Sequence, residues 1–134
     1  MEKKKRNTIF GTDITFQNNV KKYYNPGMGT ENMSNILFSL IKFLRPRVIL
    51  EFGAGLSSFF IVEALKQIQS EIPTELNYIN ENKHSLINLN QTWFKNKYNP
   101  VFHIVDNFSK ESPNYQNFVN DIENSNYKKY VERK

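Results

Sequence analysis

The chain alternates between stretches with helical spacing of apolar residues and short continuous apolar runs. Between residues 30 and 44 the apolar positions recur every three or four residues, which predicts an amphipathic helix. Pro46 ends that helix, because the residue before a proline avoids the right-handed helical region. A continuous apolar run over 48–52 follows, as in a strand that is buried on both faces.

The same alternation continues toward the C-terminus. The pattern predicts helices over residues 58–69, 84–97 and 112–122, and further strands over 75–81 and 101–106. Strands separated by helices imply βαβ units and a parallel sheet. We therefore predict an α/β fold: a Rossmann-like parallel sheet flanked by helices, with three strands in the order 3-2-1, as in part of a doubly wound fold.

The chain of 134 residues has the size of one domain. Residues 1–29 are expected to form a basic leader and a small hairpin that turns at Asn18-Asn19, or a lid containing Tyr23 and Tyr24. A packed surface loop is the alternative to the lid. Residues 30–108 form the predicted half-domain, and 109–134 a C-terminal helix and basic tail.

Composition narrows the chemistry. The chain has no cysteine, which excludes disulfides, cysteine nucleophiles and thiolate zinc sites. His84 and His103 show no metal-ligand spacing, so we expect no metal. The net charge of +5 comes partly from the two ends, and its lysines outnumber its arginines, so a nucleic-acid partner is not expected. No apolar run reaches bilayer length and the start lacks a signal-peptide core; we expect a soluble, cytoplasmic protein.

The stretch "RVILEFGAGLSSFF" predicts a strand, a glycine turn and the start of a helix. Gly53 and Gly55 permit a tight turn and the close approach of a ligand. Such a turn exposes backbone N–H groups at a helix N-terminus and forms an anion site, with Ser57 and Ser58 available to cap the helix or bind the ligand. A purely structural tight turn is the alternative.

Two acids accompany the turn. Glu51 lies two residues before Gly53, and Glu81 lies at the end of the predicted second strand. In a doubly wound sheet both would lie at the carboxyl edge, where ligands bind. A carboxylate at the end of the second strand is suited to accept two hydrogen bonds from a ribose diol, unless Glu81 is an ordinary solvated acid.

With these residues, "ILEFGAGLSS" and a strand ending in "NE", the chain resembles the class I S-adenosylmethionine-dependent methyltransferases. Glu51, Gly53 and Gly55 match the acid-x-Gly-x-Gly motif of that family, and Ser57 replaces its frequent third glycine. The resemblance covers about residues 30–108. It implies that the cofactor is S-adenosylmethionine and that its contacts are Glu51, Gly53, Ala54, Gly55, Ser57, Glu81, Asp106 and Asn107. In that assignment the turn surrounds the methionine part, Glu81 holds the ribose and Asp106 lies by the adenine.

A dinucleotide site is the competing interpretation. Its third glycine would fall at Ser58, and Glu51 would repel a pyrophosphate, whereas S-adenosylmethionine carries an ammonium and a sulfonium. A P-loop is excluded, because no Gly-Lys-Ser/Thr ends the turn.

The strand over 48–52 raises a further expectation. In a 3-2-1 order a fourth strand would cover its open edge, so we expect a truncated or split methyltransferase with an unassigned catalytic base and methyl acceptor. The alternatives are an edge covered by the N-terminal hairpin, or a non-catalytic interaction module that pairs through strand 48–52 with a partner chain or a second copy.

Overall fold

The computed structural model describes residues 8–9, 11–24, 26–27, 30–81, 97–106, 117–121 and 131–133. Within these residues the chain is a mixed α/β protein that is mostly helical. The helices are α1 (Ile14–Val20), the short 3-10 helix η1 (Lys21–Tyr23), α2 (Thr30–Leu44) and α3 (Leu56–Glu81). The strands are β1 (Thr8–Ile9), β2 (Thr12–Asp13), β3 (Val48–Phe52), β4 (Val101–Val105) and β5 (Val131–Arg133). Residues 117–121 are also helical.

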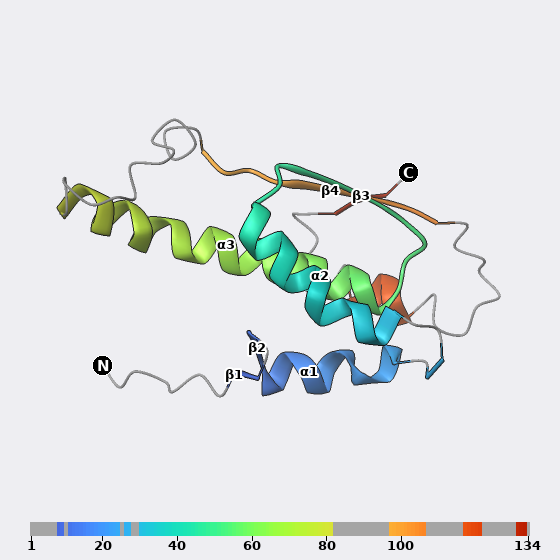
Figure 1. Ribbon diagram of the computed structural model, residues 1–134. Coiled ribbons are helices and arrows are strands. Elements are labelled where there is room, and N and C mark those ends of the chain that lie inside the picture. The colour runs from blue at the N-terminus through green and yellow to red at the C-terminus, as the bar shows by residue number, and fades with distance from the viewer. Residues whose placement is uncertain are drawn as a thin grey trace.

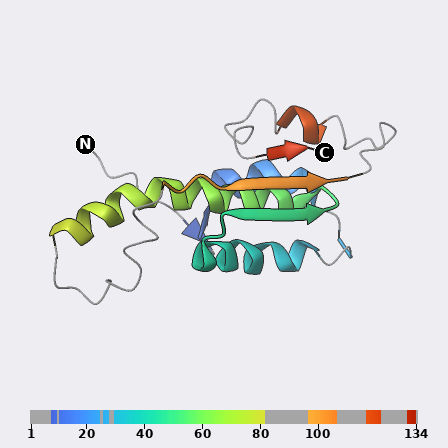
Figure 2. The same cartoon turned by 90° about the horizontal axis from the view of Figure 1, so that it is seen from above.

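The described elements form layers. The sheet of β3 and β4 lies over α2 and α3, and α1 lies beneath these two helices, away from the sheet (Figure 1). Seen from above, α2 lies beyond the edge of β3 that faces away from β4 (Figure 2). The helices α2, α3 and α1 therefore lie on one side of this sheet.

All neighbours in the main sheet are parallel, and their order is β3-β4-β5. Val48 pairs with Val101 and Phe52 with Val105, so β3 and β4 are in register along their whole length. The predicted strands over 48–52 and 101–106 are confirmed, the second ending at Val105, but they are direct neighbours. The predicted 3-2-1 order placed residues 75–81 between them, and that placement is wrong.

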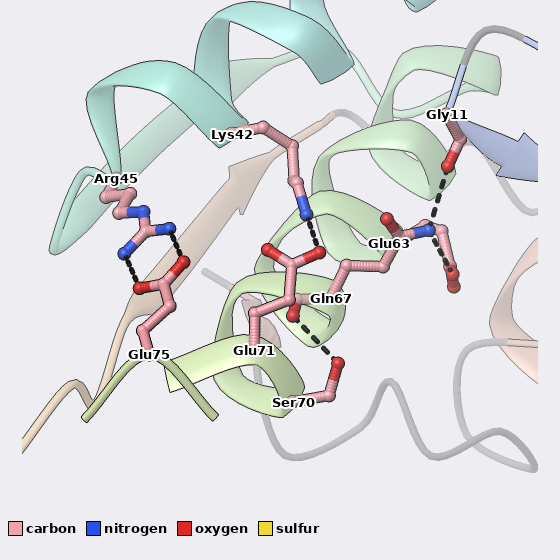
Figure 3. Close-up of polar contacts among 8 residues, drawn as sticks. All are labelled: Gly11, Lys42, Arg45, Glu63, Gln67, Ser70, Glu71 and Glu75. Atoms are coloured by element: carbon pink, nitrogen blue, oxygen red, sulfur yellow. Dashed lines mark hydrogen bonds and ion pairs between the residues drawn. The ribbon is translucent and has the colours of Figure 1, made fainter. Parts of the chain in front are cut away.

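Residues 75–81 are the last part of α3, which continues through Pro73 for 26 residues in all. Proline removes one helical N–H and disfavours a continuous helix, which is why the sequence pattern indicated a break. Contacts with α2 oppose that effect: Arg45 forms a bidentate ion pair with Glu75, and Lys42 pairs with Glu71 (Figure 3). Tertiary contacts here outweigh local propensity.

The end of α2 follows the prediction from Pro46. Arg45, which precedes the proline, has a φ of 50°, and its N–H donates to the carbonyl of Ile41 at 2.8 Å. This is the left-handed helix cap that glycine usually forms. The proline excludes Arg45 from the right-handed region, and the ion pair with Glu75 holds the side chain in place.

The core lies between the sheet and α3. Phe102 and Ile104 of β4 are fully buried, as are Val62, Leu65 and Ile68 of α3. Burial of such side chains is the main source of stability in a domain of this size. The centre of the helix is therefore fixed beneath β4, and its N-terminus is held near the carboxyl ends of the strands.

The strand β3 is covered on one face only. Ile49 and Glu51 are half-buried on the helix side, whereas the outer face of β3, formed by Val48, Leu50 and Phe52, is 64%, 55% and 76% exposed. The prediction that this strand is buried on both faces is thus wrong. The expectation of an open edge is met within the described residues, where β4 is the sole sheet neighbour of β3.

A second apolar surface lies on α2. Its buried side packs toward α3 through Ser34, Phe38 and Ile41. The outer face of α2 is exposed and consists of Met33, Ile36, Leu40, Phe43 and Leu44. At 100° per residue these five positions fall within an arc of about 100°, one continuous stripe.

The N-terminal prediction needs correction. The hairpin is formed by β1 and β2, whereas Asn18-Asn19 lies inside α1, which begins after the side-chain cap of Asp13 on Phe16 N–H at 2.7 Å. The predicted helix over 84–97 lies almost wholly outside the described residues, and residues 117–121 agree with the predicted C-terminal helix.

Candidate functional site

The glycine turn joins β3 to α3 at the carboxyl end of the sheet. Residues 53–55 connect Phe52 to Leu56, and Gly53 has a φ of 87°, which a residue with a side chain rarely adopts. The Gly53 N–H donates to the carbonyl of Val105 at 2.9 Å, so the turn is tied to the end of β4. Asp106 follows directly and lies at the same edge. Ligands in parallel α/β sheets bind at such an edge.

Glu51, near the end of β3, is joined by hydrogen bonds to the first turn of α3. The hydroxyl of Ser57 donates to Oε1 at 2.5 Å, and the hydroxyl of Ser58 donates to Oε2 at 2.6 Å. Ser58 Oγ in turn accepts the Gly55 N–H at 3.1 Å. We call Glu51, Ser57, Ser58 and Gly55 the Glu51 cluster. It fixes the turn geometry through hydrogen bonds to both carboxylate oxygens.

The surroundings of the Glu51 carboxyl in this cluster change its pKa. Burial raises the pKa of the Glu51 carboxyl above its ordinary value; the two serine hydroxyls counteract part of this effect, and the nearby Asp106 carboxylate adds to it. Two carboxylates therefore share a small region at the turn. A positively charged group there would favour the ionised form of Glu51.

The N–H groups of residues 53–55 do not form the anion site that we expected from the sequence. Gly53 donates to Val105, Ala54 donates to the Asp106 carboxylate, and Gly55 donates to Ser58. Asp106 thus occupies the place at Ala54 that a bound anion would take. A phosphate at this position would have to displace a carboxylate of the protein itself.

The outer side of the turn is open. Among the described residues, no atom outside the chain neighbours lies within 4 Å of a Cβ added at Gly53 or at Gly55. A ligand can therefore approach the backbone closely at both glycines. This access, together with the neighbouring acids, gives the turn the properties of a binding site for a cationic small molecule.

The structure brings six of the eight predicted cofactor residues together. They are Glu51, Gly53, Ala54, Gly55, Ser57 and Asp106. Glu81 is not among them: it ends α3, 25 residues beyond Leu56 and far from the turn at the other end of that helix (Figure 1). Its predicted place at a strand end is wrong, because residues 75–81 are helical. Asn107 lies outside the described residues.

Ser58 is a site residue that the sequence prediction left out of its cofactor contacts. It is fully buried and forms two of the hydrogen bonds of the Glu51 cluster. The signal was present as two adjacent serines six and seven residues after an acid. In a strand–turn–helix unit this spacing places both hydroxyls in the first turn of the helix, within reach of the acid at the strand end.

Tyr23 is part of the core and not of a lid. Its ring stacks on Phe59 at 4.6 Å between centroids and meets Phe118 edge-on. Its hydroxyl donates to Asp121 at 2.8 Å, and burial together with this carboxylate raises the pKa of the tyrosine. The packed-loop alternative fits Tyr23, while Tyr24 beside it is half exposed.

Comparison of this chain with known proteins identifies no family. No protein-family model, curated protein or solved structure matches the chain. Among the residues described, no cluster of three or more histidine and carboxylate side chains could hold a metal ion. None of the helices described is both long and apolar enough to cross a membrane.

Proposed function

We propose that the chain is the S-adenosylmethionine-binding portion of a methyltransferase built on a Rossmann-like βαβ unit of β3, α3 and β4. The observation that carries this proposal is the meeting of Glu51 and Asp106 at an open glycine turn. S-adenosylmethionine carries an ammonium, a sulfonium and one carboxylate, so its net positive charge suits a turn flanked by acids. A pyrophosphate would instead add negative charge where the turn N–H groups already have partners.

In this proposal Asp106 takes the ribose role that the sequence analysis gave to Glu81. A carboxylate at the end of the strand next to the first strand is suited to accept hydrogen bonds from the ribose diol. In the observed order that neighbouring strand is β4, and Asp106 follows it. Glu51 then orders the turn through Ser57 and Ser58, while the backbone at Gly53 and Gly55 contacts the ligand.

The chemistry required from the protein is mainly positioning. The bound cofactor supplies a methyl group on a sulfonium that is a good leaving group. The protein must hold an acceptor in line with that methyl group at close range.

Isothermal titration calorimetry with S-adenosylmethionine tests the proposal. We expect binding by the wild type and by Glu81→Gln, and affinities at least about tenfold weaker for Glu51→Gln and Asp106→Asn. Asp106→Asn keeps an oxygen acceptor for the Ala54 N–H, whereas Glu51→Gln keeps one of the two acceptors for Ser57 and Ser58, so circular dichroism must verify that each variant is folded. ATP, with the same nucleoside and a polyanion, should not bind. A folded wild type that binds no S-adenosylmethionine refutes the proposal.

The exposed β3 edge favours a second candidate function, a non-catalytic module that pairs through strand 48–52. The observation behind it is the exposure of the outer face of β3 at an edge of the sheet. Hydrogen exchange tests it: a cognate complex protects the 48–52 amides further than the isolated chain does. Both functions are contradicted if the chain binds no S-adenosylmethionine and if no complex protects the 48–52 amides further than the isolated chain does.

A further inference from the structure

We infer that α2 pairs antiparallel with the α2 helix of a second copy of this chain, through its outer face alone. The inference goes beyond both proposed functions, because this interface needs neither cofactor binding nor the edge of β3. Three observations carry it: the spacing of the apolar residues on α2, the absence of charge among them, and the open position of α2 in the fold.

The apolar residues of the outer face have the spacing of a seam between two helices. Met33, Ile36, Leu40 and Phe43 follow one another at intervals of three, four and three residues, as the a and d positions of two heptads do. These intervals read the same in both directions. An antiparallel copy therefore places Met33 opposite the second copy's Phe43, and Ile36 opposite its Leu40. Every position of the seam meets an apolar residue.

The exposed area is that of a weak, reversible dimer. The five residues of the outer face are between 49% and 84% exposed. At about 100 Å² of apolar area per side chain, each copy contributes on the order of 500 Å² and the pair about 1,000 Å², the lower bound of a specific interface. We therefore expect a dissociation constant of about 10–100 μM.

The charge pattern favours a copy of the same chain as the partner. Every exposed side chain described on α2 is uncharged, since Asn32 and Ser39 are the exposed members outside the apolar set. Lys42 and Arg45 turn toward α3, where two glutamates neutralise them (Figure 3). A two-fold interface brings the same surface of both copies together, so a net charge on it would be repulsive. The outer face of α2 avoids this repulsion.

The position of α2 leaves room for a second helix. Its buried side packs toward α3 through Ser34, Phe38 and Ile41, so the outer face points away from the core. Among the described elements, α2 lies at the outside of the fold and none lies beyond it (Figure 2). The two copies can thus meet through α2 without any change at β3. The antiparallel orientation also brings opposite ends of the two helix dipoles together.

Sedimentation equilibrium from about 5 to 500 μM tests the association. We expect the wild type to rise from 15.9 kDa toward twice that mass, and Ile36→Lys and Phe43→Lys to dissociate at least about tenfold more readily. Leu50→Lys is the matched control, because Leu50 is similarly exposed on the outer face of β3 and its replacement should leave the dimer intact. Circular dichroism verifies that each variant is folded.

Disulfide cross-linking tests the orientation, and the chain has no cysteine of its own that would interfere. Positions 33 and 43 lie about 15 Å apart along the helix axis. In an antiparallel pair Phe43→Cys therefore lies too far from its own counterpart to form a disulfide. A mixture of Met33→Cys and Phe43→Cys should instead form a covalent dimer in oxidising glutathione.

Three results would overturn the inference. They are a wild type that stays at 15.9 kDa throughout, lysine variants of α2 that associate like the wild type, and cross-linking of Phe43→Cys alone as fast as in the mixture. A monomer that nevertheless binds S-adenosylmethionine would refute the dimer alone and leave the proposed cofactor function standing.

Discussion

Removal of the Ser58 hydroxyl is the most direct perturbation of the Glu51 cluster. Ser58 is fully buried, donates to Glu51 Oε2 at 2.6 Å and accepts the Gly55 N–H at 3.1 Å. Ser58→Ala therefore leaves a carboxylate oxygen and a backbone N–H each short of a partner. Ser57→Ala removes one bond to the same carboxylate, but from a half-buried position that water can reach.

The structure sets different magnitudes for the two variants. A hydrogen bond to a charged group contributes about 1.5–3 kcal/mol, and a buried polar group without a partner costs about 1–3 kcal/mol. We expect Ser58→Ala to lower the free energy of unfolding by about 3 kcal/mol, since both effects apply there. For Ser57→Ala we expect about 1 kcal/mol, because water replaces the lost donor.

Urea denaturation followed by circular dichroism measures the difference. With an m-value of about 1–3 kcal/mol/M, a gap of about 2 kcal/mol separates the two midpoints by about 1 M urea. Ser70→Ala is the control: its exposed hydroxyl donates to the Gln67 carbonyl within α3, and its loss should change little. Equal stabilities for the Ser58, Ser57 and Ser70 variants would refute the hydrogen-bond network described for Glu51.

Three further predictions concern other groups. Because the folded state raises the pKa of Glu51, its contribution to stability is present below the ordinary value and is lost as pH rises through the raised value; in urea titrations the stability of the wild type relative to Glu51→Gln should therefore fall as pH rises above the ordinary value. A double-mutant cycle with Arg45→Ala and Glu75→Ala should give a coupling of about 1 kcal/mol for this partly buried bidentate pair, and zero coupling would contradict the fixed geometry. Phe102→Ala should destabilise the chain by about 3–5 kcal/mol in the same assay, and a loss below about 1 kcal/mol would place Phe102 outside the core.

Elements with strong local signals were predictable from the sequence. The helix over 30–44 has clear periodicity and a proline after its end, and the strand over 48–52 is a short apolar run that ends at a glycine turn. For the same reason, the glycine turn after this strand and the position of Glu51 beside it could be predicted from the sequence. Local pattern and tertiary contacts agree in this part of the chain.

The prediction for residues 75–81 was wrong because the local sequence pattern and the tertiary contacts favour different structures there. Pro73 and the apolar spacing of "ELNYINE" indicated a separate strand, but the decisive contacts come from α2. A signal existed: Lys42 and Arg45 lie three residues apart, and Glu71 and Glu75 four apart, which is complementary spacing on two packed helices. This charge spacing could be recognised only once α2 and α3 were known to pack against each other. That packing is a property of the fold and not of the local sequence.

The corrected strand order sharpens the candidate site. The sequence placed two acids at the carboxyl edge, Glu51 and Glu81, on different strands of an assumed order. In the structure Asp106 follows the strand that pairs directly with β3, and its carboxylate reaches the Ala54 N–H of the turn. Glu51 and Asp106 therefore belong to one βαβ unit, and they lie near enough for the Asp106 charge to help raise the pKa of Glu51. The N–H groups of residues 53–55 have protein partners, and the two carboxylates beside them favour a cation over a phosphate.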